Sequence, residues 1–579
     1  MTLQHHYSGP MRAVILGFTL LVPGAASPKV HPEPLHYTLA PEMSGDTVAA
    51  LRVSVQFQAE PSGTTDMGWD EGWAGENKLW QWARDFKVAG ASAVEVAGNG
   101  HWHIKAAPGA KLTATYRIVS GYDHDPRVED SEQPRPVIRP RWFYAAGNAL
   151  FAYPAHRENA PATFDWVNTP GVGFASDLEH LAGQARKALR PGTVADVLES
   201  IVIGGQDLRV FPATDGSGVR VASVGSYAFT PEQMNNLTRR VIDVERSFWK
   251  ADRRAPFLVT TAPITSTPTL TGFSGTGRGD AFALWIDERT PLDRTAWLLA
   301  HEYFHTWNPA LLGSMSQDRA ARPEQYWFSE GFTDYYARAL MVRSGIISPA
   351  QFAAEWNEML ASYAGSPVKT MPGKQAAATF WNSDAAQKLP YQRGAMLAAM
   401  WNRRLLAASK GASNLDTILV SQMRLARTAP GAATSLFRSL AQRRGLNVGP
   451  DEERFLARGQ PILLPANTFG PCATVVTAQR PSFSRGFDTE ATAASGNLAR
   501  GVDPSLPAYA AGLRDGMKIL AHIEGEPDNA LIPYVLLVED HGAQRKIRYL
   551  PQGHGQTVVQ ELQVREATTP ICSRTLGGL

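Results

Sequence analysis

The hydrophobic period of this chain changes from that of strands to that of helices, and this change limits the folds that the chain can adopt. Apolar and polar residues alternate in residues 51–57, 111–118 and 218–224. Such alternation is typical of half-buried antiparallel strands. From about residue 231 to residue 444 the apolar residues recur mostly at helical spacing. The pattern predicts a multidomain α+β protein, with an antiparallel β domain first and a mainly helical domain after it.

Length, charge and cysteine content exclude several classes of protein. A chain of 579 residues should hold about three or four domains of roughly 150 residues each. Lys and Arg number 56 against 54 Asp and Glu, a net charge of +2, so no overall field would attract nucleic acid. The only cysteines are Cys472 and Cys572, which excludes zinc sites built on several cysteines and Cys-ligated iron–sulfur clusters.

Residues 1–27 have the order of a secretory signal peptide. A positive start at Arg12 precedes a ten-residue apolar stretch at 13–22, which small residues follow at 24–27. This order predicts cleavage after Ala26 or Ser27 and export, to the periplasm or out of the cell. An apolar N-terminal strand is the alternative interpretation. A membrane-spanning helix needs about 20 apolar residues, and no later run in the sequence reaches that length, so we expect no stable membrane insertion.

The string His-Glu-Tyr-Phe-His at residues 301–305 is the main candidate for chemistry. Thr290, followed by a proline, predicts the start of the helix that contains it. On a helix, His301 and His305 lie on one face, where two imidazoles can bind one Zn²⁺. Glu302 lies beside them and can take a proton from a metal-bound water.

A catalytic zinc site needs a third protein ligand and one open position. Residues 326–336 (YWFSEGFTDYY) predict a second helix, with Glu330 in its first turn and Asp334 on the same face four residues later. Glu330 can complete the ligand set, and Asp334 can accept the second ring N–H of a ligand histidine. The alternatives are a helix-dipole acid for Glu330 and a solvated surface charge for Asp334. The neighbouring histidine pair favours the metal interpretation.

Residues 301–308 (HEYFHTWN) and 330–336 (EGFTDYY) resemble the glycyl aminopeptidase family of gluzincin zinc peptidases. The resemblance implies an N-terminal β domain, a thermolysin-like, mainly α catalytic domain and a C-terminal PDZ-like domain. On this chain we expect these domains at residues 28–225, 226–462 and 463–579.

The same resemblance assigns a further catalytic residue. In this family, and in the related alanyl and leucyl aminopeptidases, a tyrosine in a Tyr-x-Lys/Arg-Gly motif stabilises the oxyanion. The sequence Tyr-Gln-Arg-Gly at residues 391–394 fits that motif. The resemblance therefore implies that Tyr391 is the oxyanion donor.

The chain departs from the family before the zinc helix. Family members carry a Gly-Gly-Leu-Glu-His stretch on the edge strand there, whose acid is expected to hold the substrate's α-amino group. Residues 272–285 read GFSGTGRGDAFALW instead, with no glutamate at that place. We expect the edge strand at 281–286, where Ala283 and Trp285 would contact a substrate that pairs by strand addition. Asp280 is the candidate substitute for the missing acid.

The C-terminal residues 507–516 (PAYAAGLRDG) and 518–525 (KILAHIEG) resemble the core of a PDZ domain. Residues 485–487 (Arg-Gly-Phe) are the candidate loop for binding a peptide end, and a plain hairpin turn is the alternative. Cys472 and Cys572 flank this module, and a disulfide between them in an exported protein would contribute at most about 4–5 kcal/mol in the chain-entropy model. Two buried free thiols are the alternative.

These features predict a zinc-dependent peptidase that hydrolyses peptide bonds with a metal-activated water. The resemblance favours an aminopeptidase with Zn²⁺ as cofactor and peptides or proteins as substrates. An endopeptidase of the same chemistry is one alternative. A non-catalytic envelope protein that binds peptides through its β and PDZ-like domains is the other, and a peptide ligand of the PDZ-like domain is the further partner expected.

Overall fold

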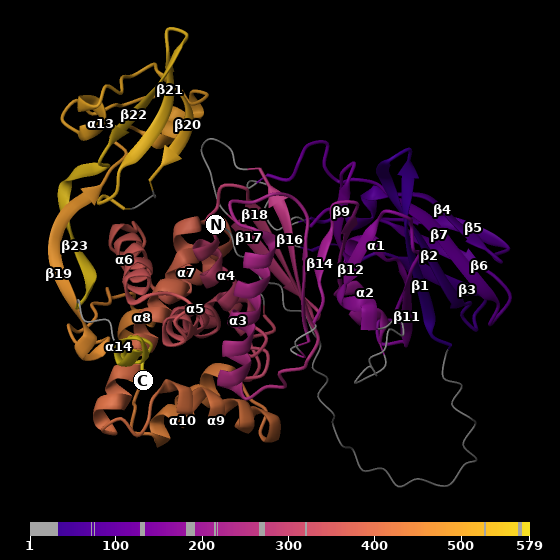
Figure 1. The fold of residues 1–579 in the computed structure, drawn as a ribbon, viewed down its shortest axis with the longest axis horizontal. Helices are drawn as coiled ribbons and strands as arrows, with labels where there is room; N and C mark the ends of the chain where they lie inside the picture. The colour runs from indigo at the N-terminus through magenta and orange to yellow at the C-terminus, as the bar shows by residue number, and fades with distance from the viewer. Residues whose placement is uncertain are drawn as a thin grey trace.

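The computed structural model describes residues 33–565 and 570–579, apart from gaps at 71, 74–75, 128–133, 181–191, 214–215, 217, 266–272, 319–320 and 526–528. The expected signal peptide therefore lies outside the described residues. The chain is a mixed α+β protein, with a β-rich region at the N-terminal end and a helical body after it (Figure 1).

Two sheets make up the N-terminal β region, and their inner faces share one hydrophobic core. The first has the order β11-β1-β2-β7-β4, and the second has the order β10-β3-β6-β5. Alternating burial along β1 and β2 agrees with the period-two pattern of the sequence. The strands are β1 (Leu35–Ser44), β2 (Thr47–Gln58), β3 (Thr64–Gly68), β4 (Ala83–Ala89), β5 (Ala93–Gly98), β6 (His101–Lys105), β7 (Lys111–Ile118), β10 (Tyr153–Pro154) and β11 (Ala162–Trp166).

A third sheet, of order β12-β13-β9-β8, joins this region to the helical body. Its Tyr144, Ile201 and Ile203 pack against Ala283 and Trp285 of the next sheet in one buried cluster. Its elements, with the short helices beside it, are β8 (Val137–Ile138), β9 (Trp142–Ala146), α1 (Gly147–Leu150), β12 (Gly173–Ser176), α2 (Val194–Leu198) and β13 (Ile201–Gly205).

The sheet that supports the candidate site has the order β14-β15-β16-β18-β17. Strands β15, β16 and β18 run parallel, and β14 and β17 pair antiparallel at the two edges. Its strands are β14 (Arg209–Phe211), β15 (Val219–Ser223), β16 (Phe257–Ile264), β17 (Phe273–Arg278) and β18 (Ala281–Asp287). Because β14 and β15 belong to this sheet, the catalytic unit begins before residue 226, where the sequence placed its boundary.

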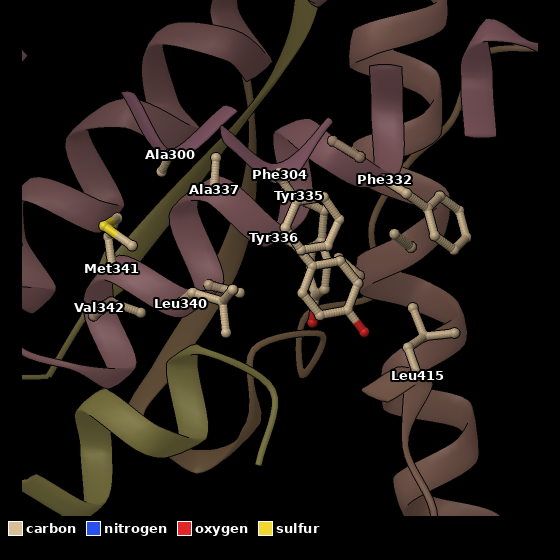
Figure 2. Close-up of a cluster of buried hydrophobic side chains, with 14 of the residues drawn as sticks. Ala300, Phe304, Phe332, Tyr335, Tyr336, Ala337, Leu340, Met341, Val342 and Leu415 are labelled. Carbon is tan, nitrogen blue, oxygen red and sulfur yellow. The ribbon is translucent and has the colours of Figure 1, made fainter. Parts of the chain in front are cut away.

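The helical body packs on the face of this sheet that carries Phe282, Leu284 and Ile286. Figure 2 shows part of this core, where the rings of Phe304 and Tyr336 stack with centroids 5.2 Å apart. The helices are α3 (Pro231–Trp249), α4 (Leu292–Phe304), α5 (Tyr326–Arg343), α6 (Pro349–Gly365), α7 (Gly373–Thr379), α8 (Asp384–Ala408), α9 (Leu415–Thr428), α10 (Ala433–Arg443) and α11 (Gly449–Asp451).

The C-terminal part divides into a ribbon that packs on the body and a small sheet beyond it (Figure 1). Phe469, Val475, Leu562 and Leu576 lie in the same core as the catalytic helices. Both ends of the expected unit 463–579 therefore pack with the body, and the residues between them share a separate small core. Its elements are β19 (Ala473–Phe483), α12 (Thr489–Ala494), α13 (Pro507–Ala510), β20 (Lys518–Glu524), β21 (Tyr534–Asp540), β22 (Ala543–Tyr549), β23 (Gln552–Val564) and α14 (Pro570–Leu576).

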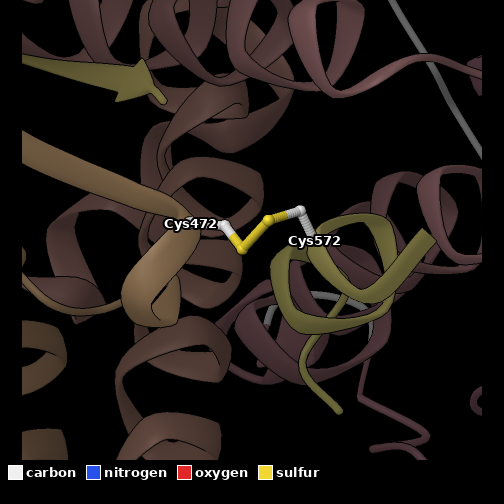
Figure 3. The surroundings of a disulfide bond; sticks show 2 residues. All are labelled: Cys472 and Cys572. Carbon is white, nitrogen blue, oxygen red and sulfur yellow. A yellow bond between two sulfur atoms is a disulfide. The ribbon is translucent and has the colours of Figure 1, made fainter. Parts of the chain in front are cut away.

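Cys472 and Cys572 form a disulfide, with Cα atoms 5.5 Å apart (Figure 3). Cys472 precedes β19 and Cys572 lies on α14, so the bond joins the two ends of the C-terminal part. Beyond it, Arg343 of α5 donates a hydrogen bond to the Gly577 carbonyl. The disulfide thus holds α14 against the helix that carries Glu330.

The small sheet has the order β20-β21-β22. Residues 485–487, the expected peptide-binding loop, are followed by helix α12. A PDZ domain binds its peptide by strand addition at a sheet edge. Because a helix follows it, this loop has no strand edge directly after it, and its role in binding a peptide end stays a prediction.

No helix in the described parts of the chain has both the length and the apolar character needed to cross a membrane.

Candidate metal centre and active site

Helix α4 carries His301 in its last turn, and His305 is its C-cap residue. The helix begins at Leu292 with Pro291 as its N-cap, one residue later than Thr290 predicted. His301 and His305 are both fully buried, and their Nε2 atoms lie 3.2 Å apart. The four-residue spacing therefore brings the two rings to one point, as the sequence predicted.

Helix α5 brings a carboxylate to the same point. Because α5 begins at Tyr326, Glu330 lies in its second turn, not in the first turn that the sequence predicted. The Glu330 Oε2 atom is 3.5 Å from Nε2 of His301 and 3.2 Å from Nε2 of His305. Within the described residues, these three side chains form the one group of histidines, cysteines and acids with atoms close enough to share a metal ion.

The separations of these three atoms fit a tetrahedral zinc site. Zinc binds imidazole nitrogen and carboxylate oxygen at about 2.0–2.2 Å, so two ligands of a tetrahedral site lie about 3.3–3.5 Å apart. The pairs among His301, His305 and Glu330 are separated by 3.2–3.5 Å. Two nitrogens and one oxygen are also the donor set of catalytic zinc sites that keep one position open.

Glu302 follows His301 on α4 and is almost buried, with 6% of its surface exposed. Tyr391 of α8 also lies at the ligand set, where its ring stacks on that of His301 with centroids 5.8 Å apart. Its hydroxyl donates a hydrogen bond to Glu330. Burial, with the charges of Glu330 and Glu302, raises the pKa of Tyr391 well above its usual value, so the hydroxyl stays an O–H donor.

Two glycines explain why α8 comes so close to the ligands. A Cβ on Gly331 would lie 2.4 Å from the Cα of Gly394, and a Cβ on Gly394 would lie 2.0 Å from the carbonyl oxygen of Trp327. Both distances are far inside van der Waals contact, so α5 and α8 cross where neither has a side chain. Gly331 follows the metal-ligand candidate Glu330, and Gly394 ends the Tyr-Gln-Arg-Gly motif. Each of the two motifs therefore includes one of the glycines at which α5 and α8 touch.

Asp334 lies one turn after Glu330 and is buried. Its Oδ1 is 3.8 Å from Nδ1 of His301 and accepts a 2.9 Å hydrogen bond from Nε1 of Trp297. Its Oδ2 is 2.5 Å from Nη1 of Arg338. The carboxylate therefore faces the ligand histidine, and two other side chains hold it. The sequence did not indicate Trp297 or Arg338, although each lies four residues from a predicted site residue on its own helix.

Asn308 is another residue that the sequence did not single out for the site. Its carbonyl oxygen lies 2.7 Å from Nδ1 of His305. Its side-chain amide donates to the carbonyl oxygens of Phe328 and Ser329 and to the hydroxyl of Thr333. Asn308 therefore orients the ring of His305 and ties the end of α4 to the start of α5.

The structure corrects the expected substrate strand. β18 pairs with β16 on one side and with β17 on the other, so it is an inner strand, and β17 is the edge. Ala283 and Trp285 are buried in the cluster on the far face of the sheet from the helices. Asp280 lies in the turn between β17 and β18, where its backbone N–H donates to Asp177. None of these three side chains is brought to the metal centre.

Comparison with known proteins agrees with this site. Residues 294–396 match the sequence profile of the family described as M61 glycyl aminopeptidase, and they include the histidines, Glu330 and Tyr391. This region of the chain belongs to the M61 glycyl aminopeptidase family. The resemblance seen in the sequence is thereby confirmed, and membership supports peptidase activity. No curated protein matches the chain.

Solved structures were compared with the fold of the whole chain. An aminopeptidase N family protein from Idiomarina loihiensis superposes with a TM-score of 0.63 at 15% identity, covering 94% of this chain and 99% of that one. An M1 zinc metallopeptidase from Deinococcus radiodurans gives a TM-score of 0.41 at 16% identity, covering 75% of this chain and 95% of that one. The first of these shows that the arrangement of domains, and not only the matched region, is shared.

Proposed function

We propose that the protein is a zinc-dependent peptidase in which His301, His305 and Glu330 hold the metal. The observation that carries this proposal is the convergence of their Nε2 and Oε2 atoms at 3.2–3.5 Å, in a buried place. A zinc ion bound there would polarise the scissile carbonyl and lower the pKa of a bound water to about 7.

Glu302 is the proton carrier of the reaction in this proposal. Its carboxylate accepts a proton from the attacking water and afterwards donates it to the nitrogen of the leaving amine. Its place next to His301 on α4 supports this role, as does the influence of its charge on Tyr391. Its burial keeps bulk water from competing for the proton.

The hydroxyl of Tyr391 donates a hydrogen bond to the oxygen of the scissile carbonyl group, on which the negative charge develops. The hydrogen bond that it makes with Glu330 supports the assignment, because it places the hydroxyl at the ligand set. Asp334 orients the ring of His301 from the opposite side, as carboxylates next to ligand histidines do.

An extended substrate would add to the edge strand β17, antiparallel to it. The face of β17 that points to the helices carries glycines at 275 and 277, and a Cβ on Gly277 would meet no atom within 4 Å. Neither glycine offers a charge to a substrate's α-amino group. Family membership favours an aminopeptidase, and this open edge favours an endopeptidase as the second candidate.

Export and a peptide ligand for the C-terminal module remain part of the proposal. The disulfide between Cys472 and Cys572 supports export, because such bonds persist in oxidising compartments. The outer edge of β22 is the place where a peptide could add a strand, because the start of β20 is already hydrogen-bonded to residues 497–499.

Digestion of a mixed peptide library, with and without a chelator, tests the proposal. We expect new termini that the chelator abolishes and that added zinc restores. Cleavage one residue from free N-termini, absent from N-acetylated peptides, identifies an aminopeptidase, and internal cleavage of both identifies an endopeptidase. Stoichiometric zinc with no cleavage of any peptide would instead support the non-catalytic alternative.

A further inference from the structure

Helices α4 and α5 face each other with complementary rows of side chains at the metal centre. A four-residue spacing places three residues of each helix on the facing sides: Trp297, His301 and His305 of α4, and Glu330, Asp334 and Arg338 of α5. Glu330 faces both histidines, and Asp334 faces His301 and Trp297. Arg338 faces Trp297, with its guanidinium carbon 5.5 Å from the ring centroid. The two facing rows thus have the metal-ligand candidates at one end and Arg338 at the other.

Arg338 is buried and holds the Asp334 carboxylate in place. Its Nη1 lies 2.5 Å from Oδ2 of Asp334 and donates to the Asp334 carbonyl oxygen at 3.0 Å. Trp297 holds the other oxygen, Oδ1, at 2.9 Å. Because each carboxylate oxygen has its own donor, the carboxylate cannot rotate without breaking a charge-assisted or indole hydrogen bond. The oxygen that faces His301 is thereby fixed.

The buried guanidinium of Arg338 has charged groups on two sides. Buried charges in proteins are usually paired. Arg338 is the cation in contact with Asp334, and its Nε lies 3.6 Å from Glu355 on α6. Glu355 anchors the guanidinium from behind, so the arginine is itself held between two helices.

We propose that Arg338 is a positioning residue of the metal centre: by holding Asp334 in its orientation, it fixes the ring of His301 and raises the affinity of the site for its metal. The proposal depends on the ligand assignment made under the proposed function. Groups that orient a ligand from outside typically change metal affinity by about 10- to 100-fold.

The test is a zinc titration of the apo full-length protein against a chromophoric chelator, which measures affinity without any turnover. Arg338→Met keeps the unbranched stem of the side chain and removes its charge, and we expect the affinity of this variant for zinc to fall by about 10- to 100-fold. Arg338→Lys keeps the positive charge but not the planar guanidinium group. Its affinity for zinc should therefore lie between those of the unaltered protein and of Arg338→Met. Arg343→Met is the matched control, because Arg343 also lies on α5, with 10% of its side chain exposed, but pairs with Asp416 of α9. It should lower the melting temperature and leave zinc affinity unchanged.

A double-mutant cycle with Asp334→Asn separates positioning from a general structural effect. If Arg338 acts through Asp334, the double variant should bind zinc no more weakly than Asp334→Asn alone. Additive losses, or an Arg338→Met affinity equal to that of the unaltered protein, would overturn the proposal. Should Arg338→Met fail to fold, Arg338→Lys carries the same cycle with the same two outcomes.

The titration also separates failure of this proposal from failure of the proposed function. If the unaltered protein binds no zinc, or if His301→Ala binds it equally well, the ligand assignment is wrong and the role of Arg338 falls with it. If zinc binding is stoichiometric and depends on His301 but not on Arg338, only the positioning role is refuted.

Discussion

Replacing Gly394 by alanine should separate two helices and misplace the oxyanion donor while leaving the metal ligands in place. The added Cβ would lie 2.0 Å from the Trp327 carbonyl oxygen and 2.7 Å from the Cα of Gly331. Both neighbours are backbone atoms, which cannot rotate away. An ordinary contact of 3.4 Å requires α8 to move away from α5 by more than roughly 1 Å.

The expected losses of stability and of kcat both follow from that displacement of α8. Overpacking a well-packed core typically costs about 1–3 kcal/mol of unfolding free energy. Tyr391 lies one turn before Gly394 on α8, so its hydroxyl should move with the helix, and a misplacement of about 1 Å can reduce kcat about 100-fold. His301, His305 and Glu330 lie on α4 and α5, so zinc content should stay stoichiometric.

The assay compares urea unfolding, bound zinc and kcat of the variant with those of the unaltered protein. Gly431→Ala is the control, because its Cβ would make only an ordinary 3.5 Å contact with Leu436. Gly394→Ala with unchanged kcat and stability would show that the close crossing does not position Tyr391.

Three further perturbations have defined outcomes. Replacing Cys472 and Cys572 by serine opens a loop with a sequence separation of 100 and should lower the unfolding free energy by up to about 4–5 kcal/mol; unchanged urea midpoints would contradict this. Tyr391→Phe should lower kcat by roughly 100-fold with little change in zinc content, and equal kcat would remove the oxyanion assignment. Burial raises the pKa of Asp177 to about 7, so the folded state binds a proton that the unfolded state releases near pH 4, and stability should fall as pH rises from about 4 to 7. Asp177→Asn should remove up to about 3 kcal/mol of that fall between pH 5 and pH 8, and parallel stability curves for both proteins would refute the linkage.

The metal centre could be predicted in large part from the sequence because its signals are local. Helical spacing alone brings His301 and His305 to one face, and the same rule places Asp334 behind Glu330. Helical spacing within one segment could not predict which side chains of different helices touch. Arg338 is one more turn along the same face, but nothing local distinguishes it from a solvated arginine until α4 and α6 are packed against it.

The edge of the sheet could not be predicted in the same way, because strand order depends on residues far apart in the chain. Residues 281–286 lie just before the zinc helix and were for that reason expected at the edge. Every residue of β18 is buried, which is the property of an inner strand covered on both faces. Its nearly continuous apolar run carried that signal in the sequence. The domain boundaries differ for a similar reason, since β14 and β15 join their sheet by pairing with β16.

Turnover and zinc content of Glu302→Gln, measured on the same preparation, test the central claim most directly. The substitution keeps the size of the side chain and removes its ability to carry a proton. We expect one zinc ion per chain, as in the unaltered protein, and hydrolysis reduced by about 10²- to 10⁴-fold. Stoichiometric zinc with unchanged turnover would contradict the account, because the proton would then be carried by a group other than Glu302.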